Sequence, residues 1–200
     1  MEHIQHIVYI NLDHRTDRRT EIEHELERMD LSGERFAAIH TKPGCIGCAK
    51  SHLAVLKMAK ERGWDHVLIL EDDFQFIIDK EVVNTQLKAF FDLKIPYDVL
   101  MVSYAINKSL PYNDIVCRAV DVQTASGYLV HSRFYDSLIQ NLSEAITLLI
   151  STGKHWYYAN DQSWKKLQPH SLWFCMNIRF GKQRPSYSDN AEQFMDYGYC

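Results

Sequence analysis

The sequence lacks long apolar runs, an excess of basic residues and internal repeats. No uninterrupted apolar stretch approaches the roughly 20 residues that a membrane-spanning helix requires, so we expect no membrane span. The 22 Lys and Arg residues are outnumbered by 26 Asp and Glu residues, which leaves a net charge of −4 at pH 7. This balance argues against a nucleic-acid-binding protein that relies on bulk positive charge. Without repeats or low-complexity linkers, we expect the 200 residues to form one domain.

Cysteines are few, odd in number and irregularly spaced. The five are Cys45, Cys48, Cys117, Cys175 and Cys200. Their number and spacing argue against a disulfide scaffold and favour a reducing compartment. The first six residues contain no basic start followed by an apolar stretch, so we also expect no signal peptide and a cytoplasmic location.

The hydrophobic pattern predicts an α/β sandwich. Runs rich in β-branched and aromatic residues predict strands at 6–12, 35–40, 66–70, 97–104, 115–122, 126–131 and 171–175. Apolar residues at helical spacing predict helices near 22–29, 49–59, 81–91, 132–142, 143–150 and 161–167. Because strands alternate with helices, we expect a mostly parallel central sheet.

The strongest functional signal is an acidic triplet, Glu71-Asp72-Asp73, which directly follows the apolar strand at 66–70. Ligands of open α/β sheets bind beyond the carboxyl ends of the strands, which is where this triplet is expected to lie. Adjacent carboxylates repel one another, and a hard divalent cation such as Mg²⁺ or Mn²⁺ prefers oxygen ligands of this kind. The alternative is a solvated acidic turn. The position after a buried strand favours a metal site.

A second signal is the arginine-rich segment that follows the first predicted strand. It contains Asn11, Arg15, Arg18 and Arg19, and it faces the same edge of the sheet as the triplet. Guanidinium groups suit phosphate or a nucleobase edge. The alternative is simply a charged helix N-terminus, but arginines there oppose the helix dipole, which favours a ligand.

A third signal is the small-residue segment at 44–52, which contains Ser51 and His52. Such a segment allows close approach of a ligand to backbone N–H groups at the start of a helix. Its Cys45-x-x-Cys48 pair suggests zinc or redox chemistry. We discount both, because the sequence has no second such pair and no histidine pair at zinc-finger spacing. The two cysteines are interpreted as small packing residues.

Two later segments carry weaker signals. Aromatic residues surround Asp161 at 155–164, an arrangement typical of sites that bind sugars, because pyranose faces stack on aromatic rings. The alternative for Asp161 is helix N-capping. The polar segment from Gln183 to Asp189 indicates by itself only an ordered loop or a tail.

Taken in order, these segments resemble glycosyltransferase family 25, which includes bacterial lipopolysaccharide galactosyltransferases, collagen galactosyltransferases and relatives in large DNA viruses. The resemblance covers about residues 6 to 190, and the Leu-Glu-Asp-Asp sequence at 70–73 is its most specific element. The other matching elements are Asn11-Leu12, Arg15-Thr16-Asp17-Arg18, Gly47-Cys48-Ala49-Lys50-Ser51-His52-Leu53, Ser126-Gly127-Tyr128-Leu129, Asp161, Gln183 and Ser188-Asp189. The aromatic-rich context at 183–187 differs from that of the bacterial members.

The resemblance implies a GT-A fold, a Rossmann-like α/β/α sandwich, with a nucleotide-binding half at about 1–105 and an acceptor-side half with a C-terminal tail at about 106–200. It also implies a UDP-sugar donor, Mn²⁺ or Mg²⁺, inversion at the anomeric carbon, and a role in lipopolysaccharide or other glycan biosynthesis. The acceptor would be a carbohydrate or a glycosylated or hydroxylated protein. For a viral member, the location would be the host cytoplasm.

The same resemblance implies a role for each candidate site residue. Asp73 would bind the metal directly. Glu71 or Asp72 would reach the metal through water or contact the ribose or sugar of the donor, and Glu71 is also a candidate metal ligand. Nucleotide binding is assigned to Asn11, Arg15 and Arg18, and the donor pocket to Ser51 and His52. Asp161 is the candidate general base.

The sequence is also compatible with two other functions. A non-catalytic protein that binds nucleotide sugars or glycans, or that acts in adhesion, can have the same fold, although the intact acidic triplet favours an enzyme. A metal-dependent phosphohydrolase can use the same carboxylates. It would leave the arginine, small-residue and aromatic segments without a joint explanation.

Overall fold

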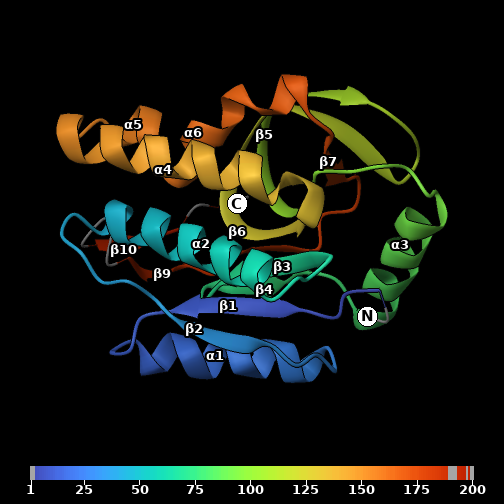
Figure 1. The fold of residues 1–200 in the computed structure, drawn as a ribbon. Coiled ribbons are helices and arrows are strands. Elements are labelled where there is room, and N and C mark those ends of the chain that lie inside the picture. Colours follow the sequence, from blue (N-terminus) through green and yellow to red (C-terminus); the bar gives the residue numbers. More distant parts are fainter. Residues whose placement is uncertain (1–2, 189–192, 197, 199–200) are drawn as a thin grey trace.

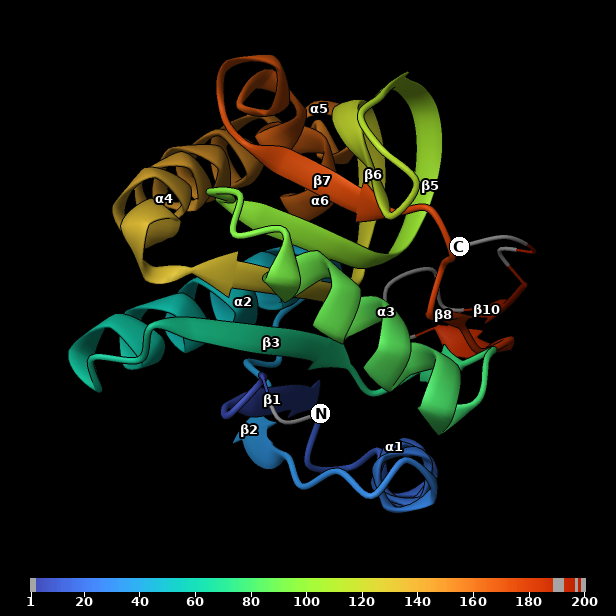
Figure 2. The same cartoon turned by 90° about the vertical axis from the view of Figure 1, so that its right-hand side faces the viewer.

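The computed structural model describes residues 3–188, 193–196 and 198. Asp189 of the Ser-Asp pair and Cys200 lie outside these described residues. The central sheet has six strands in the order β2-β1-β3-β6-β5-β7, an order that Figure 2 shows from bottom to top. These strands are β1 (Ile7–Asn11), β2 (Glu34–Ala37), β3 (His66–Glu71), β5 (Val99–Pro111), β6 (Val116–His131) and β7 (Trp173–Met176).

The sheet is mostly parallel, as predicted. β1 pairs in parallel with β2 and β3, and β5 pairs in parallel with β7. β6 runs antiparallel to its neighbours β3, β5 and β7. The topology therefore agrees with the mixed α/β fold class, with a single reversed strand inside the sheet.

Two apolar clusters lie on opposite faces of the sheet, because successive strand residues point to opposite sides. Along β3, Val67 and Ile69 belong to the cluster covered by helices α2 (Gly44–Glu61) and α4 (Tyr135–Thr152). Leu68 and Leu70 belong to the cluster covered by α1 (Thr16–Arg28) and α3 (Lys80–Asp92). Figure 1 shows α2 and α4 lying side by side.

Smaller elements complete the chain. Strands β4 (Phe74–Phe76) and β8 (Gly181–Gln183) form an antiparallel pair, as do β9 (Ser186–Ser188) and β10 (Gln193–Met195). The short helices are α5 (His155–Tyr158), α6 (Asn160–Ser163) and three 3₁₀ turns at Ser132–Phe134, Trp164–Lys166 and Gln168–His170. No helix within the described parts of the chain combines the length and apolar character needed to cross a membrane.

Two pairs of predicted elements are single elements in the structure, and the helix predicted at 161–167 is the short helix α6 followed by a 3₁₀ turn. The strands predicted at 115–122 and 126–131 form one long strand, β6, which bends at Thr124, where φ is +85°. The Thr124 N–H donates to the Asp161 carboxylate at 3.0 Å instead of to a neighbouring strand. The helices predicted at 132–142 and 143–150 form the single helix α4, because its apolar stripe continues through Ala145 and Leu149.

Candidate functional site

A pocket of about 820 Å³ opens at the carboxyl ends of β1, β2 and β3, the position where α/β sheets bind ligands. The N-terminal part of α2 and the segment around β9 form its other walls. Its lining residues are Ile10, Leu12, His14, Arg18, Ala38, Ile39, His40, Thr41, Lys42, Pro43, Gly44, Cys48, Ser51, His52, Glu71, Asp72, Asp73, Gln183, Tyr187 and Ser188. The acidic triplet, Arg18, Ser51 and His52 therefore lie around one cavity.

Strand register brings the first two predicted segments together. β1 and β3 run in parallel with Ile10 opposite Glu71, so the residues that follow each strand emerge at the same edge. There the Asn11 amide Nδ2 donates to the Asp72 carboxylate at 2.7 Å. The Asn11 Oδ1 accepts from Arg35 Nε at 3.0 Å. Asn11 is buried and holds Asp72 in place, and it does not line the pocket.

Arg18 links the arginine segment to the carboxylates. Its guanidinium lies 2.9 Å from Asp72 Oδ1 and 3.3 Å from Asp73 Oδ2, and its other end donates to the Tyr187 carbonyl. The protein therefore supplies part of the counter-charge that the triplet requires. Burial raises the pKa of Asp72, and the charge and hydrogen bond of Arg18 oppose this increase.

Asp73 has the most perturbed titration of the three carboxylates. Burial, together with the negative charges of Glu71 and Asp72, raises its pKa to about 7. Its Oδ1 is buried without a hydrogen-bond partner among the described residues. The Gln183 amide nitrogen, brought in by the pairing of β8 with β4, lies 3.5 Å from Asp73 Oδ2 and 3.4 Å from Glu71 Oε2.

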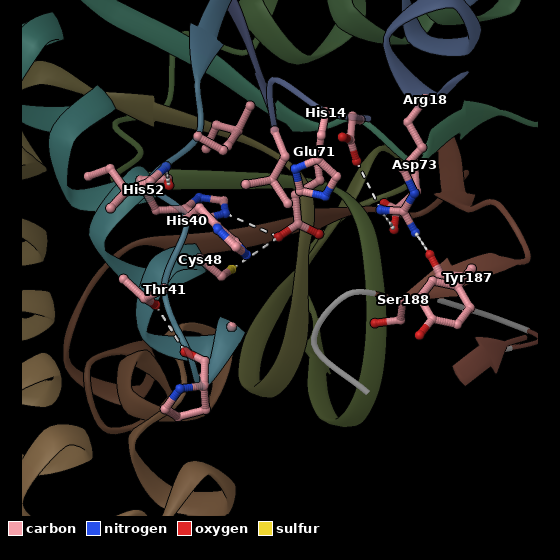
Figure 3. A pocket seen from close by; sticks show the side chains of 18 of the residues that line it. His14, Arg18, His40, Thr41, Cys48, His52, Glu71, Asp73, Tyr187 and Ser188 are labelled. Carbon is pink, nitrogen blue, oxygen red and sulfur yellow. Dashed lines mark hydrogen bonds and ion pairs between the residues drawn. The ribbon is translucent and has the colours of Figure 1, made fainter. Parts of the chain in front are cut away.

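Glu71 lies between two groups of side chains (Figure 3). On one side are Asp73 and Arg18. On the other side, His52 Nε2 lies 3.1 Å from Glu71 Oε1 and Cys48 Sγ lies 3.5 Å from the same oxygen. Burial alone would raise the pKa of Glu71, but the hydrogen bonds of His52 and Cys48 and the charge of Arg18 outweigh it and lower the pKa.

Ser51 and His52 are fully buried at the base of the pocket. The Ser51 hydroxyl donates to the Gly47 carbonyl and accepts from the Ile39 N–H, which fixes α2 against the segment after β2. His52 Nδ1 shares a hydrogen bond of 2.7 Å with the Tyr128 hydroxyl. The predicted contact of Ser51 or His52 with the sugar-nucleotide donor stays a prediction.

Besides Asn11, the predicted site residues Arg15 and Asp161 lie apart from the pocket lining. The Arg15 guanidinium is bonded to the Asp17 carboxylate and the Tyr187 carbonyl. Asp161 supports the bend of β6 through Thr124. Burial raises the pKa of Asp161, and the negative charge of Glu71 adds to this increase. The roles predicted for Arg15 and Asp161 stay predictions.

Cys48 is a pocket residue to which the sequence pattern assigns no site role. The pattern pairs it with Cys45 as a packing residue, yet its sulfur faces Glu71 and His52. Cys48 and His52 are four residues apart in α2, so both side chains lie on one helix face. That Cys-x-x-x-His spacing was the available signal, and it was obscured by the more familiar Cys-x-x-Cys pattern.

Comparison with solved structures places this architecture among known folds. A glycosyltransferase involved in the glycosylation of the major capsid of PBCV-1 superposes with a TM-score of 0.58 at 10% identity, over 93% of this chain and 95% of that chain. A197 from STIV superposes with a TM-score of 0.50 at 13% identity, over 86% of this chain and 81% of that chain. The fold is GT-A-like.

Sequence comparison adds no closer assignment. No protein-family model matches the chain, and no curated protein matches it. At 10% and 13% identity, the structural likeness establishes the fold alone. Membership of glycosyltransferase family 25 stays a prediction.

Proposed function

We propose that this protein is a metal-dependent glycosyltransferase that moves a hexose from a UDP-sugar to a hydroxyl group of a glycan or hydroxylated protein, with inversion. The observation that carries the proposal is the position of Asp73 and Glu71. They lie together at the carboxyl end of β3, inside a pocket of about 820 Å³, in a GT-A-like fold. The glycosyltransferase described for PBCV-1 has a similar fold, which supports this reaction class.

The carboxylates fit a divalent cation. Asp73 Oδ1 is buried and unpartnered within the described structure, and burial together with the charges of Glu71 and Asp72 raises the pKa of Asp73. Three carboxylates face one guanidinium at this edge, so negative charge remains for a divalent cation to balance. Asp73 and Glu71 would hold the ion, with the Gln183 side chain beside them. When bound, Mn²⁺ or Mg²⁺ would supply Lewis-acid stabilisation of the departing diphosphate.

The remaining residues would bind and orient the donor. Arg18 lines the pocket beside the triplet and carries a charge complementary to phosphate. Asn11 fixes Asp72, and Asp72 fixes Arg18, so the three side chains form one preorganised unit. Arg15, Ser51 and His52 complete the proposed donor-binding set.

We assign the general base to Asp161. Its raised pKa, caused by burial and the charge of Glu71, gives the carboxylate a greater affinity for a proton. In this role Asp161 would take the proton from the acceptor hydroxyl as that oxygen attacks the face opposite the diphosphate.

Asp161→Asn tests this assignment. The amide keeps an oxygen that can accept from Thr124 N–H, so the fold and the affinity for UDP and Mn²⁺ should be retained. The rate of transfer should fall by at least about 100-fold, which is the usual contribution of a general base. A transfer rate near that of the parent protein would assign the base to another residue.

Release of UDP tests the reaction class. The protein is incubated with UDP-galactose or UDP-glucose and Mn²⁺, with and without oligosaccharide acceptors, and UDP and inorganic phosphate are quantified. We expect UDP release that increases with acceptor and disappears with EDTA. Tight UDP binding without turnover over the acceptor panel would indicate a binding protein, and phosphate release without acceptor would indicate a phosphohydrolase.

A further inference from the structure

Three potential metal ligands of different chemistry meet on one wall of the pocket. They are Cys48 and His52 of α2 and Glu71 at the end of β3, and their ligand atoms all lie within 4.8 Å of one another. The thiol and the imidazole both approach the same carboxylate oxygen, Glu71 Oε1, at 3.5 and 3.1 Å. These contacts face away from the Arg18–Asp73 side of Glu71 (Figure 3).

The spacing suits a small tetrahedral ion. With bonds of about 2.0–2.3 Å to zinc, neighbouring ligand atoms of a tetrahedral site lie roughly 3.3–3.6 Å apart. The two distances from Glu71 Oε1 are close to this range. The Cys48 and His52 ligand atoms lie within 4.8 Å of each other and would have to approach by about 1.3 Å at most. A sulfur, a nitrogen and an oxygen ligand together favour Zn²⁺ over Mn²⁺ or Mg²⁺, which prefer oxygen ligands.

Tyr128 supplies the support that a metal-binding histidine normally has. Its hydroxyl is bonded to His52 Nδ1 at 2.7 Å, and both side chains are fully buried. With His52 Nδ1–H donating to this oxygen, the lone pair of Nε2 points toward Cys48 and Glu71. Hydrogen bonding of the second ring nitrogen to an oxygen fixes the ring orientation in most histidine metal sites.

We propose that Cys48, His52 and Glu71 form a Zn²⁺ site in the wall of the pocket, which shares Glu71 with the proposed Mn²⁺ site at Asp73. Cys48 and Glu71 are partly exposed to the pocket, so an ion can reach them. Three protein ligands leave the fourth tetrahedral position open to water or to a group bound in the pocket.

Glu71 belongs to both sites, and this sharing has a functional consequence that rests on the proposed glycosyltransferase activity. Zn²⁺ bound by Cys48 and His52 would occupy the Glu71 carboxylate, which would then no longer bind Mn²⁺ together with Asp73. Zn²⁺ should therefore inhibit transfer in competition with Mn²⁺. The existence of the Zn²⁺ site itself does not depend on that activity.

Cobalt binding tests the site directly. Co²⁺ added to the reduced, metal-free protein should produce a near-ultraviolet thiolate-to-cobalt charge-transfer band, and Zn²⁺ should abolish the band. Cys48→Ser should remove the band and weaken Zn²⁺ binding by at least about tenfold, measured by competition with a chromophoric chelator. Cys45→Ser, three residues away in the same helix, is the matched control and should retain both. A band that survives Cys48→Ser would overturn the proposal.

Asp73→Asn separates this proposal from the proposed function. The variant should lose Mn²⁺-dependent UDP binding and keep the cobalt band. If the parent protein shows no transfer activity but keeps a Cys48-dependent band, the proposed function fails and the zinc site stands. If the parent protein transfers sugar but shows no Cys48-dependent band, the zinc site fails and the proposed function stands.

Alkylation provides a measurement that needs no variant. Zn²⁺ should slow the modification of Cys48 by iodoacetamide, located by peptide mass mapping, by at least about tenfold, and it should leave Cys45 unaffected. Equal alkylation of Cys48 with and without Zn²⁺ would contradict the site.

Tyr128→Phe tests the support of His52. The variant retains all three ligands and should weaken Zn²⁺ binding by about 10- to 100-fold.

Discussion

Among the carboxylates of the acidic triplet, Asp73 has the least favourable environment for its ionised form. Its carboxylate is buried beside Glu71 and Asp72, and Arg18 compensates only part of the negative charge. In the folded protein burial and the neighbouring carboxylates raise its pKa to about 7, against an ordinary value of 3.8 for an Asp side chain. The folded state therefore binds one more proton than the unfolded state between these two pH values.

This linkage predicts how stability depends on pH. In EDTA, the free energy of unfolding should fall as pH rises from about 4 to 7, because the folded state must release a proton that the unfolded state has already lost. Asp73→Asn removes the contribution of Asp73 to this dependence, and the raised pKa values of Asp72 and Asp161 leave the remainder. At pH 8 the variant should be about 1–3 kcal/mol more stable than the parent protein, and at pH 4 the difference should vanish. Urea unfolding at both pH values measures it, and a difference independent of pH would contradict the assignment.

At the scale of elements, the β4–β8 pair positions the carboxylates. Phe74 directly follows Asp73 and is fully buried, with its ring packed against the backbones of Gly127 in β6 and Gly181 in β8. A Cβ on Gly181 would lie 2.2 Å from Phe74 Cζ, so only glycine allows this approach. The close contact holds Gln183, two residues further on, beside Asp73 and Glu71.

Gly181→Ala should therefore disturb both stability and metal binding. The added methyl group collides with Phe74, and overpacking of this kind costs about 1–3 kcal/mol. Displacement of Phe74 would move Asp73 and weaken Mn²⁺-dependent UDP binding by about tenfold. Thermal unfolding and calorimetric titration measure the two effects.

The double variant Gly181→Ala/Phe74→Leu is the control for Gly181→Ala. The smaller side chain makes room for the methyl group, so part of the stability lost in the single variant should return. If the two substitutions are simply additive, the contact between Phe74 and Gly181 does not control the geometry.

At the scale of the whole molecule, the pocket joins segments that are far apart in the chain. Arg18, the triplet at 71–73 and Gln183 come from the beginning, the middle and the end of the described structure. A ligand that bridges them would bind the folded protein and not the unfolded chain. Binding should then stabilise the entire fold.

UDP together with Mn²⁺ should raise the melting temperature. At a ligand concentration of 100 times its Kd, the stabilisation is about 2.7 kcal/mol, which corresponds to roughly 5–10 °C for a protein of this size. UDP in EDTA should give a much smaller shift. Differential scanning fluorimetry measures both, and equal shifts with Mn²⁺ and with EDTA would contradict metal-dependent binding of UDP.

The pattern of apolar residues was sufficient to predict the fold class and most elements. The run at 66–70 predicted a buried strand with the acidic triplet at its carboxyl end, because an apolar stretch of that length must lie in the core. The burial of Asp72 and Asp73 themselves was not evident from the sequence. Element boundaries were less certain. The bend at Thr124 is stabilised by Asp161, a residue distant in sequence, so local pattern suggested two strands instead of one.

The sequence by itself determined which groups end up at the edge of the sheet, because the alternation of strands and helices directs the residues after β1 and β3 to the same side. Only the tertiary structure decided how those groups pair. Arg18 compensates Asp72 and Asp73, Asn11 supports Asp72, and Cys48 faces Glu71 instead of Cys45. Strand register and helix orientation set these distances, and both depend on packing across the whole core, which no local stretch of sequence contains.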